Sequence, residues 1–235
     1  MFTQINQPKS IQFKSDRVLL NLGCGHIRPI GWINTDSSLN AFLQKFPFLQ
    51  IVLKKYSNLV IYESQNVTYM DLRKRWKFTS NSVDVVYTSH LFEHLSLIHT
   101  ELFLREAYRV LKPKGVIRIV VPDLCQLAKQ YIEAYEQNKE DASNTFLYCL
   151  NLHKEGFYPS NRRFAKRVID WMQGYPHQHK YMYDYLSLKK IMQSAGFINQ
   201  NESSYGESKY IPEIKQVEYT GEGMPSIYIE STKPN

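Results

Sequence analysis

The sequence predicts an α/β fold built on a mostly parallel, doubly wound sheet. Short apolar and β-branched runs, typical of strands, alternate along the chain with segments in which apolar residues recur at helical spacing. Parallel strands are joined by right-handed crossovers, so an alternating order of this kind indicates a sheet covered by helices. The 235 residues suffice for a single domain, 1–235, with an insertion, and two independent domains are not expected.

The first predicted strand, Leu19–Leu22, ends in the glycine turn Gly23-Cys24-Gly25. A second strand over 31–36 ends in Asp36. Glycine allows the backbone to come close to a ligand, and a carboxylate at the end of the second strand can accept hydrogen bonds from both hydroxyls of a ribose. These two features indicate a site for a nucleoside-type cofactor.

The loop lacks the features that bind phosphate. The dinucleotide fingerprint requires a third glycine where this chain has Arg28, and no GKS or GKT sequence follows. A cofactor with an adenosine and no phosphate fits better, and S-adenosylmethionine is the obvious candidate. A glycine pair is also common in ordinary turns, so the motif alone leaves a structural role open.

The following segments continue the alternation as far as Asp123. The clearest central strand is 82–89, which is β-branched and largely apolar, as expected of a strand buried on both faces. Lys112-Pro113-Lys114-Gly115 is a predicted helix stop. In chain order we expect helical segments at 41–46 and 49–56, a strand at 67–72, the strand at 82–89, a helix at 96–111 and a strand at 116–121.

Residues 124–175 are mostly helical in pattern and rich in aromatic side chains. The segment is too long for a simple connection and follows the carboxyl end of a strand, where ligands bind in open α/β sheets. We predict that it is a helical insertion forming a substrate lid. A helix over 186–195 and a final strand over 226–230 complete the expected fold.

Composition narrows the class of protein. A hydrophobic content of 43% and a charged content of 22% are typical of a globular protein, and no apolar run is long enough to cross a bilayer. The polar start lacks the pattern of a signal peptide, and the three cysteines form no CxxC pair, so a cytoplasmic location is expected. The net charge of +7 would suit an anionic partner, but the basic residues form only short clusters that solvated faces also explain.

In this order, from about Arg17 to Glu230, the segments resemble the class I S-adenosylmethionine-dependent methyltransferases. Within that class the chain is similar to methyltransferases associated with glycan biosynthesis. The resemblance implies a Rossmann-like, mostly parallel seven-stranded sheet. It rests on the motifs at 20–25, 31–36, 69–73, 82–90, 93–95, 109–113, 120–124, 179–184 and 195–197.

The resemblance also implies roles for individual residues. Asn21 occupies the position of an acidic residue that contacts the methionine amino group in many relatives, and Ile27 replaces a further loop glycine. We expect both departures from the family pattern to affect the affinity for the cofactor more than whether it binds. The implied cofactor-binding set is Asn21, Gly23, Cys24 and Gly25 near the methionine and ribose, Asp36 at the ribose, Asp71 and Leu72 at the adenine, and Ser89 and His90 near the transferable methyl group.

Three residues after the central strand are candidates for the chemistry. Methyl transfer from a sulfonium is an in-line displacement, and an oxygen or nitrogen acceptor must also lose a proton. His90, Glu93 and His94 follow the strand beside the expected methyl position, and Phe92-Glu93-His94 resembles a stretch that lines the active site in some small-molecule and lipid methyltransferases. We predict His94 as the base, with Glu93 beside it and His90 as a cofactor or substrate contact. The alternative is that Glu93 favours a helix start and His94 is a packing residue.

No metal site is expected. His177 and His179 could be combined with Cys149 and His153 on paper, but nothing in the sequence gives these side chains a common geometry. We expect His179, with Lys180 and Tyr183, to shape the mouth of the substrate pocket or to cap the next helix.

The leading function is therefore methylation of a small molecule or glycan with S-adenosylmethionine. Methylation of RNA is an alternative suggested by the positive charge, although the chain has no added RNA-binding module and no Asn-Pro-Pro-Tyr type motif, so a nucleic-acid partner is not favoured. A third alternative is a cofactor-binding or scaffold protein of the same fold without catalysis.

Overall fold

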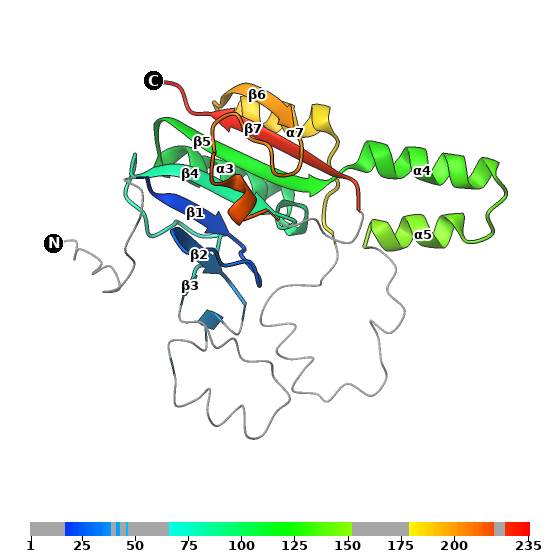
Figure 1. The fold of residues 1–235 in the computed structure, drawn as a ribbon, viewed down its shortest axis with the longest axis horizontal. Helices are drawn as coiled ribbons and strands as arrows, with labels where there is room; N and C mark the ends of the chain where they lie inside the picture. Colours follow the sequence, from blue (N-terminus) through cyan, green and yellow to red (C-terminus); the bar gives the residue numbers. More distant parts are fainter. Residues whose placement is uncertain (1–16, 39–40, 43–45, 47–65, 152–178, 219–223) are drawn as a thin grey trace.

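A computed structural model describes residues 17–38, 41–42, 46, 66–151, 179–218 and 224–235 (Figure 1). They form one seven-stranded sheet with the order β3-β2-β1-β4-β5-β7-β6. Strands β1 to β5 pair in parallel, whereas β7 runs antiparallel to both of its neighbours. The expectation of a mostly parallel α/β sheet is confirmed. The strands are β1 Leu19–Leu22, β2 Trp32–Asp36, β3 Val67–Tyr69, β4 Val83–Ser89, β5 Leu111–Pro122, β6 Ile198–Ser203 and β7 Ser226–Thr232.

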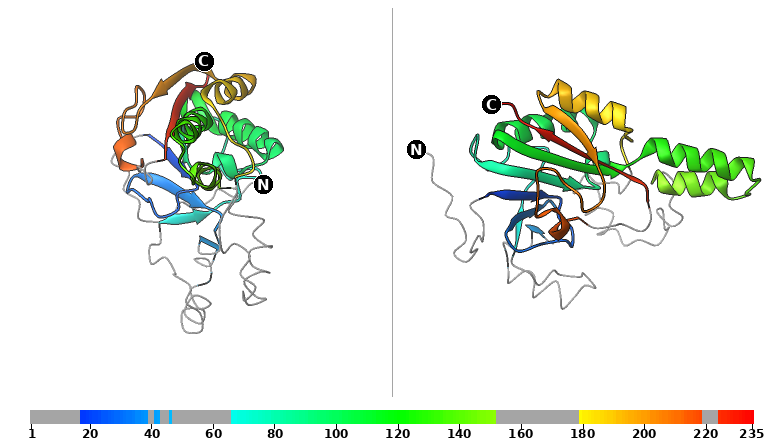
Figure 2. Two further views of the ribbon diagram at one scale, coloured as in Figure 1. Left: turned by 90° about the vertical axis from the view of Figure 1, so that its right-hand side faces the viewer. Right: turned by 45° about the horizontal axis from the view of Figure 1, so that its top comes forward.

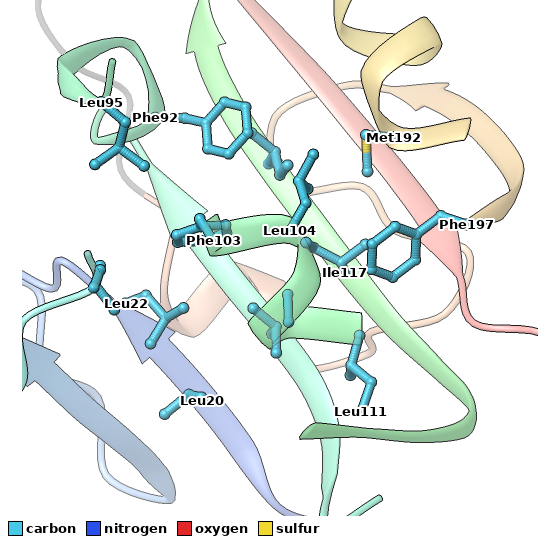
Figure 3. Packing of buried hydrophobic residues seen from close by; sticks show 14 of the residues in the cluster. Leu20, Leu22, Phe92, Leu95, Phe103, Leu104, Leu111, Ile117, Met192 and Phe197 are labelled. Carbon is cyan, nitrogen blue, oxygen red and sulfur yellow. The ribbon is translucent and has the colours of Figure 1, made fainter. Parts of the chain in front are cut away.

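Helices cover one face of the sheet, where the main hydrophobic core lies (Figure 3). Phe103 and Leu104 of α3 and Met192 of α7 pack there against inward-facing strand residues such as Leu20 and Ile117. The helical elements are η1 Phe92–His94, α3 Leu97–Val110, α4 Leu124–Glu136, α5 Ala142–Cys149, α7 Tyr185–Ser194 and η2 Ile214–Gln216.

The opposite face carries a second apolar cluster. Alternate residues of β4 and β5, among them Val85 and Val116, meet Ile211, Ile214 and Val217 from the segment around η2. In the described part of the chain this face is thus covered by an irregular segment rather than by a long helix. The expected helices at 41–46 and 49–56 lie almost entirely outside the described residues. Within these two ranges the structure describes 41–42, which are helical, and 46, which is not.

Strand β5 begins earlier than predicted. It follows α3 directly at Leu111 and includes the expected stop at 112–115. The pairing of β4 with β5 shifts register between Val83 and Val85, so the extra residues form a bulge within the strand. The residue Lys114 has a φ of 62°, consistent with this local kink.

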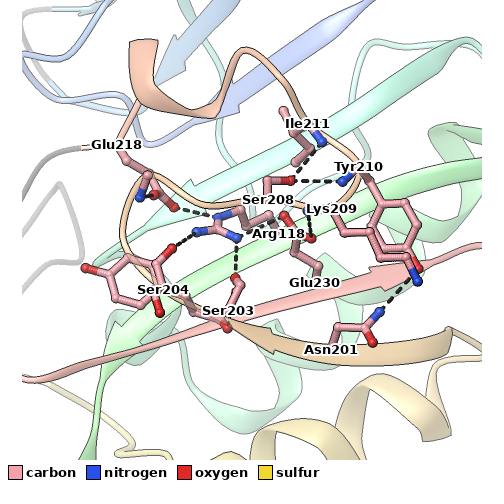
Figure 4. A network of polar contacts seen from close by, with 12 residues as sticks. Arg118, Asn201, Ser203, Ser204, Ser208, Lys209, Tyr210, Ile211, Glu218 and Glu230 are labelled. Atoms are coloured by element: carbon pink, nitrogen blue, oxygen red, sulfur yellow. Dashed lines mark hydrogen bonds and ion pairs between the residues drawn. The ribbon is translucent and has the colours of Figure 1, made fainter.

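A buried ion-pair network ties the segment around η2 to the sheet (Figure 4). Arg118 of β5 is fully buried and donates to Glu218 at 2.5 Å and to Glu230 of β7 at 2.9 Å. It also donates to the Ser204 carbonyl at 3.0 Å, and Glu218 accepts from the Gly206 backbone N–H at 2.6 Å. The network joins two strands to the segment that covers the second face.

The start of the predicted insertion is a helical hairpin. Asp123 caps α4 by accepting hydrogen bonds from the Cys125 and Gln126 backbone N–H groups. Tyr131 of α4 stacks on Phe146 of α5 with ring centroids 5.0 Å apart. The two helices leave the sheet at the end of β5 and project away from it (Figures 1 and 2), while 152–175 lies outside the described residues. Within the described ranges, no helix has the length and apolar character needed to span a membrane.

Candidate active site

The residues predicted to bind the cofactor lie along one edge of the sheet. Because β1, β2, β3 and β4 run parallel, their carboxyl ends meet at this edge. The glycine loop follows β1, Asp36 ends β2, Asp71 follows β3, and His90 follows β4. The parallel topology therefore brings these segments to the same edge of the sheet.

Backbone geometry explains both glycines of the first loop. Gly23 has a φ of 68°, and a Cβ there would lie 2.1 Å from the Cδ1 atom of Leu91. Gly25 has a φ of 49°, but a Cβ there would meet no protein atom within 4 Å. Gly23 is thus required for packing against the segment after β4, whereas Gly25 borders open space at the sheet edge.

Asp36 holds the glycine loop as well as ending β2. Its Oδ2 atom accepts from the Gly25 backbone N–H at 3.1 Å, and its Oδ1 atom accepts from the Ser38 backbone N–H at 2.6 Å. The carboxylate is half-buried. Its position beside Gly25 fits the predicted ribose contact.

Asn21 has a role inside the protein. The side chain is buried, and its Nδ2 atom donates to the Ile27 carbonyl at 2.9 Å and to Asn34 Oδ1 at 3.0 Å. These bonds fasten the far end of the glycine loop to β2. The amide nitrogen is therefore engaged in positioning the loop, and the predicted contact of Asn21 with the methionine stays a prediction.

The thiol of Cys24 lies between the two glycines and is buried. Burial raises its pKa to about 12, and the nearby Asp36 carboxylate adds to the rise. The side chain is therefore a neutral packing group at neutral pH, and its backbone N–H donates to the Thr35 carbonyl at 2.9 Å.

Asp71 and Leu72 turn in different directions. Asp71 is half-buried and accepts two hydrogen bonds from the Arg73 guanidinium, at 2.9 and 3.1 Å. Burial alone would raise the pKa of this carboxyl, but the bonds and charge of Arg73 outweigh burial and lower it. The Leu72 side chain belongs to the main core, so only its backbone remains for the predicted contact with an adenine.

The segment after β4 brings the three candidate chemical residues together. His90 adopts a φ of 47°, and its backbone N–H donates to the Val120 carbonyl at 2.9 Å. Its Nδ1 atom lies 3.5 Å from Glu93 Oε1, and its Nε2 atom lies 3.3 Å from Ser226 Oγ. Ser89 ends β4 directly before this turn.

The segment that begins at His179, after the predicted insertion, completes the cluster. The backbone N–H groups of Lys180 and Tyr181 donate to the Glu93 carbonyl at 2.8 and 3.2 Å. The His179 ring lies against that of His94, with centroids 5.0 Å apart, and its Nε2 atom is 3.9 Å from Glu93 Oε1. His179 therefore belongs to the same cluster as Glu93 and His94.

Tyr183 does not shape a pocket mouth as expected. The side chain is buried, its hydroxyl lies 3.2 Å from Thr100 Oγ1, and its ring packs on Phe92. Instead it anchors 179–183 across η1 and α3, which fixes the position of His179. The next helix is capped by Asp184 through Ser187, and not by the three residues for which capping was the predicted alternative.

Sequence reasoning missed the contact of His90 with Ser226 and the contact of His179 with Glu93. Ser226 begins β7, and the antiparallel pairing of β5 with β7 sets Ser226 opposite Pro122, which brings it to the site edge. The motif that includes His179 and Lys180 marks this segment in the sequence. It does not predict that the segment contacts Glu93.

Comparison with known proteins was made for sequence and for structure. Residues 20–119 match the model of a family described as a methyltransferase domain. No curated protein sequence matches the chain.

Three solved methyltransferases illustrate the structural likeness. One from Archaeoglobus fulgidus has 16% identity and a TM-score of 0.46, with 94% of this chain and 88% of that chain covered. One from Mesorhizobium loti has 12% identity and a TM-score of 0.45, with 92% and 90% covered. Phosphoethanolamine N-methyltransferase 2 of Haemonchus contortus has 13% identity and a TM-score of 0.44, with 95% and 50% covered. Likenesses this distant carry no argument about substrate.

The matched residues 20–119 run from β1 into β5 and include the glycine loop, Asp36, Asp71 and the segment 90–94. Over these residues, which are fewer than half of the chain, the sequence is similar to a methyltransferase domain.

Proposed function

We propose that the protein transfers the methyl group of S-adenosylmethionine to an oxygen or nitrogen atom of a small molecule or glycan. The observation that carries the proposal is the convergence, at one sheet edge, of an adenosine-type loop with a cluster of titratable side chains after β4. A site with both parts can bind the donor and handle the acceptor's proton.

The donor would lie along the carboxyl ends of β1 to β4. We assign Gly23, Cys24 and Gly25 to its methionine and ribose, and Asp36 to the ribose hydroxyls. Open space above Gly25 and the carboxylate beside it support this assignment. Asp71 and the Leu72 backbone would meet the adenine, and Ser89 with His90 would face the methyl group.

The acceptor would be activated at the histidine cluster. In-line displacement needs the nucleophile aligned with the methyl group and stripped of its proton, and a histidine can accept that proton. His94 is assigned this role because it is half-buried beside Glu93, which is buried and can orient a neighbouring imidazole. His90 would contact donor or acceptor, since it lies between Glu93 and Ser226.

The proposed acceptor class is supported by the insertion that follows β5. The insertion 124–175 begins at the end of β5, at the same edge, and we assign it as the substrate lid. The aromatic side chains Tyr135 and Tyr148 are 69% and 62% exposed on its first hairpin, which suits stacking against a sugar or a planar molecule.

Transfer of a labelled methyl group from S-adenosylmethionine tests the proposal. The protein would be incubated with separate fractions of polar small molecules, glycans and total RNA at two salt concentrations. We expect label in the small-molecule or glycan fraction, little changed by salt. Label in RNA that is lost at high salt would instead support RNA methylation, because phosphate contacts are salt-sensitive. Absence of label in all fractions, with the donor bound, would favour the scaffold alternative.

The role of His94 is tested on the labelled fraction. His94→Ala should lower turnover at least tenfold while leaving S-adenosylhomocysteine affinity unchanged. The matched control is His99→Ala, since His99 lies in α3 and bonds to Ser96 outside the cluster. Wild-type turnover in His94→Ala would return this residue to a packing role.

A further inference from the structure

Glu93 is a buried carboxylate whose surroundings do not satisfy it. Its side chain is 1% exposed, and Oε2 is one of the buried polar atoms in the described ranges that have no hydrogen-bond partner. Its Oε1 atom lies 3.5 Å from His90 Nδ1 and 3.9 Å from His179 Nε2. A buried carboxylate is costly unless a cation pairs with it, so this one calls for positive charge at the cluster.

Two imidazoles stand beside this carboxylate in a pattern suited to a metal ion. One ligand atom each from Glu93, His94 and His179 can be chosen so that all three lie within 4.8 Å of one another. Atoms that share one zinc ion at about 2.0–2.2 Å are at most about 4.4 Å apart, so small side-chain rotations suffice to close the set.

The backbone fixes the three ligands relative to one another. Glu93 and His94 lie in the short helix η1, whereas His179 comes from a distant segment. That segment is bonded to the Glu93 carbonyl through two backbone N–H groups and is anchored by the buried Tyr183. The cluster is thus held by the fold.

We propose that Glu93, His94 and His179 bind one divalent transition-metal ion of the zinc type. Two imidazoles and one carboxylate are a ligand set that zinc uses with a fourth position left to water or substrate. His90, whose Nδ1 atom lies 3.5 Å from Glu93 Oε1, is a positioning residue for the carboxylate. This differs from the sequence expectation of no metal, which considered His179 only with Cys149, His153 and His177. Two of those, His153 and His177, lie outside the described residues.

The binding of the ion stands independently of methyl transfer, but its use there rests on the proposed function. An acceptor hydroxyl bound at the open position would lose its proton to water more easily, because a bound metal ion lowers the pKa of a coordinated oxygen. The oxygen would then form a bond to the methyl carbon as the carbon–sulfur bond of the donor breaks, and neutral S-adenosylhomocysteine would leave. His94 would then hold the ion, and the ion would take over the activation assigned above to the free imidazole.

Calorimetric titration of the metal-free full chain with Zn²⁺, without methyl donor, tests the binding. We expect one ion per chain, at least tenfold weaker binding in His94→Ala and in His179→Ala, and wild-type binding in the control His99→Ala. Glu93→Gln keeps the side-chain shape and should also weaken binding tenfold or more. No stoichiometric binding, or equal binding in both ligand variants, would overturn the proposal.

Substitution with Co²⁺ separates this site from the cysteines. A nitrogen and oxygen ligand set should give visible d–d absorption that disappears in His179→Ala, without a thiolate charge-transfer band in the near ultraviolet. A thiolate band would assign the ion to a cysteine and contradict the proposed site. Methyl transfer that persists in the presence of a chelator would support the proposed function and show that the metal is not needed for it. Zinc binding without methyl transfer would support the metal site and contradict the proposed function.

Discussion

At the scale of single residues, the carboxyl edge of the sheet combines groups that hold the backbone with groups that remain available to a ligand. Asp36 accepts from the Gly25 backbone N–H, and Asn21 donates to the carbonyl of Ile27, two residues after the glycine pair. The loop is therefore preformed before any donor binds, which lowers the ordering cost of binding. Asp36 both holds the loop and remains available to a ligand, because its carboxylate also borders the open space at Gly25.

Replacing Asp36 should separate these duties. Asp36→Ala is expected to weaken S-adenosylhomocysteine binding at least tenfold, because the proposed acceptor of the ribose hydroxyls is lost. A small loss of stability is also expected from the two backbone bonds. Calorimetry and thermal melting measure the two effects. The control Asp141→Ala removes a carboxylate whose side chain makes no cap hydrogen bond to α5. Equal affinity in Asp36→Ala would remove Asp36 from the binding site.

Cys24 should be chemically inert. With its pKa raised to about 12 by burial, the thiol is almost entirely protonated at pH 8, and the thiolate is the reactive form. Alkylation by iodoacetamide, followed by mass spectrometry of the peptides, should label the exposed Cys125 long before Cys24. Similar labelling rates at the two positions would show that Cys24 is neither buried nor neutral.

At the scale of elements, α3 fixes the loop that follows Asp71. Glu106 accepts from the Trp76 backbone N–H at 2.7 Å and from Arg109, and Arg109 donates to the carbonyls of Trp76 and Phe78. Burial would raise the pKa of Glu106, but these bonds outweigh burial and lower it below its usual range.

The lowered pKa of Glu106 predicts an acid-sensitive contribution to stability. A carboxyl whose folded pKa is lowered stabilises the fold fully above its unfolded pKa, near 4.5, and loses that contribution as the pH falls through the folded value. Denaturant unfolding of Glu106→Gln should therefore show lower stability than wild type at pH 7, with the gap narrowing below pH 4.5. Glu101→Gln, on the exposed side of the same helix, is the control. A gap that stays constant down to pH 3 would contradict the assignment.

The elements that the sequence predicted well are those with a local signal. Strand β4 reads as apolar along its length because both of its faces are buried, and the structure confirms it. Strand β6 has the polar sequence INQNES, since it lies at the sheet edge with exposed side chains, and neither alternation nor hydrophobicity marks it. The start of β5 was misplaced because Pro113 and Gly115 form a bulge there instead of a loop.

In the candidate site, too, the sequence predicts the features that have a local signal and misses those that depend on long-range contacts. The glycine loop and Asp36 adjoin predicted strands, so their meeting follows from parallel topology. The contact of His179 with Glu93 depends on a long-range anchor through Tyr183, which no local pattern encodes.

At the scale of the whole molecule, the Arg118 network holds the second face of the sheet in place. Arg118 is a charged residue within the apolar run of β5, and the sequence does not predict its partners. These are Glu218 and Glu230, about 100 residues further along the chain (Figure 4). Once Arg118 is buried, both carboxylates depend on it.

Removing Arg118 should therefore be costly. Arg118→Met leaves Glu218 and Glu230 buried without their cation, and we expect a loss of about 3–5 kcal/mol in the free energy of unfolding. Arg105→Met, at an exposed position of α3, should change it by less than about 0.5 kcal/mol. Denaturant unfolding at neutral pH compares the two. Similar small effects in both variants would show that the network does not stabilise the fold.

The central claim is that the sheet edge binds an adenosine cofactor without a phosphate and uses it as a methyl donor. Calorimetric titration of the wild-type protein with S-adenosylmethionine, S-adenosylhomocysteine and NAD⁺ tests it most directly, because no acceptor is needed. We predict saturable one-to-one binding of the first two and none of NAD⁺, since Arg28 replaces the glycine that a pyrophosphate requires. Absence of binding by either adenosyl ligand would contradict the account.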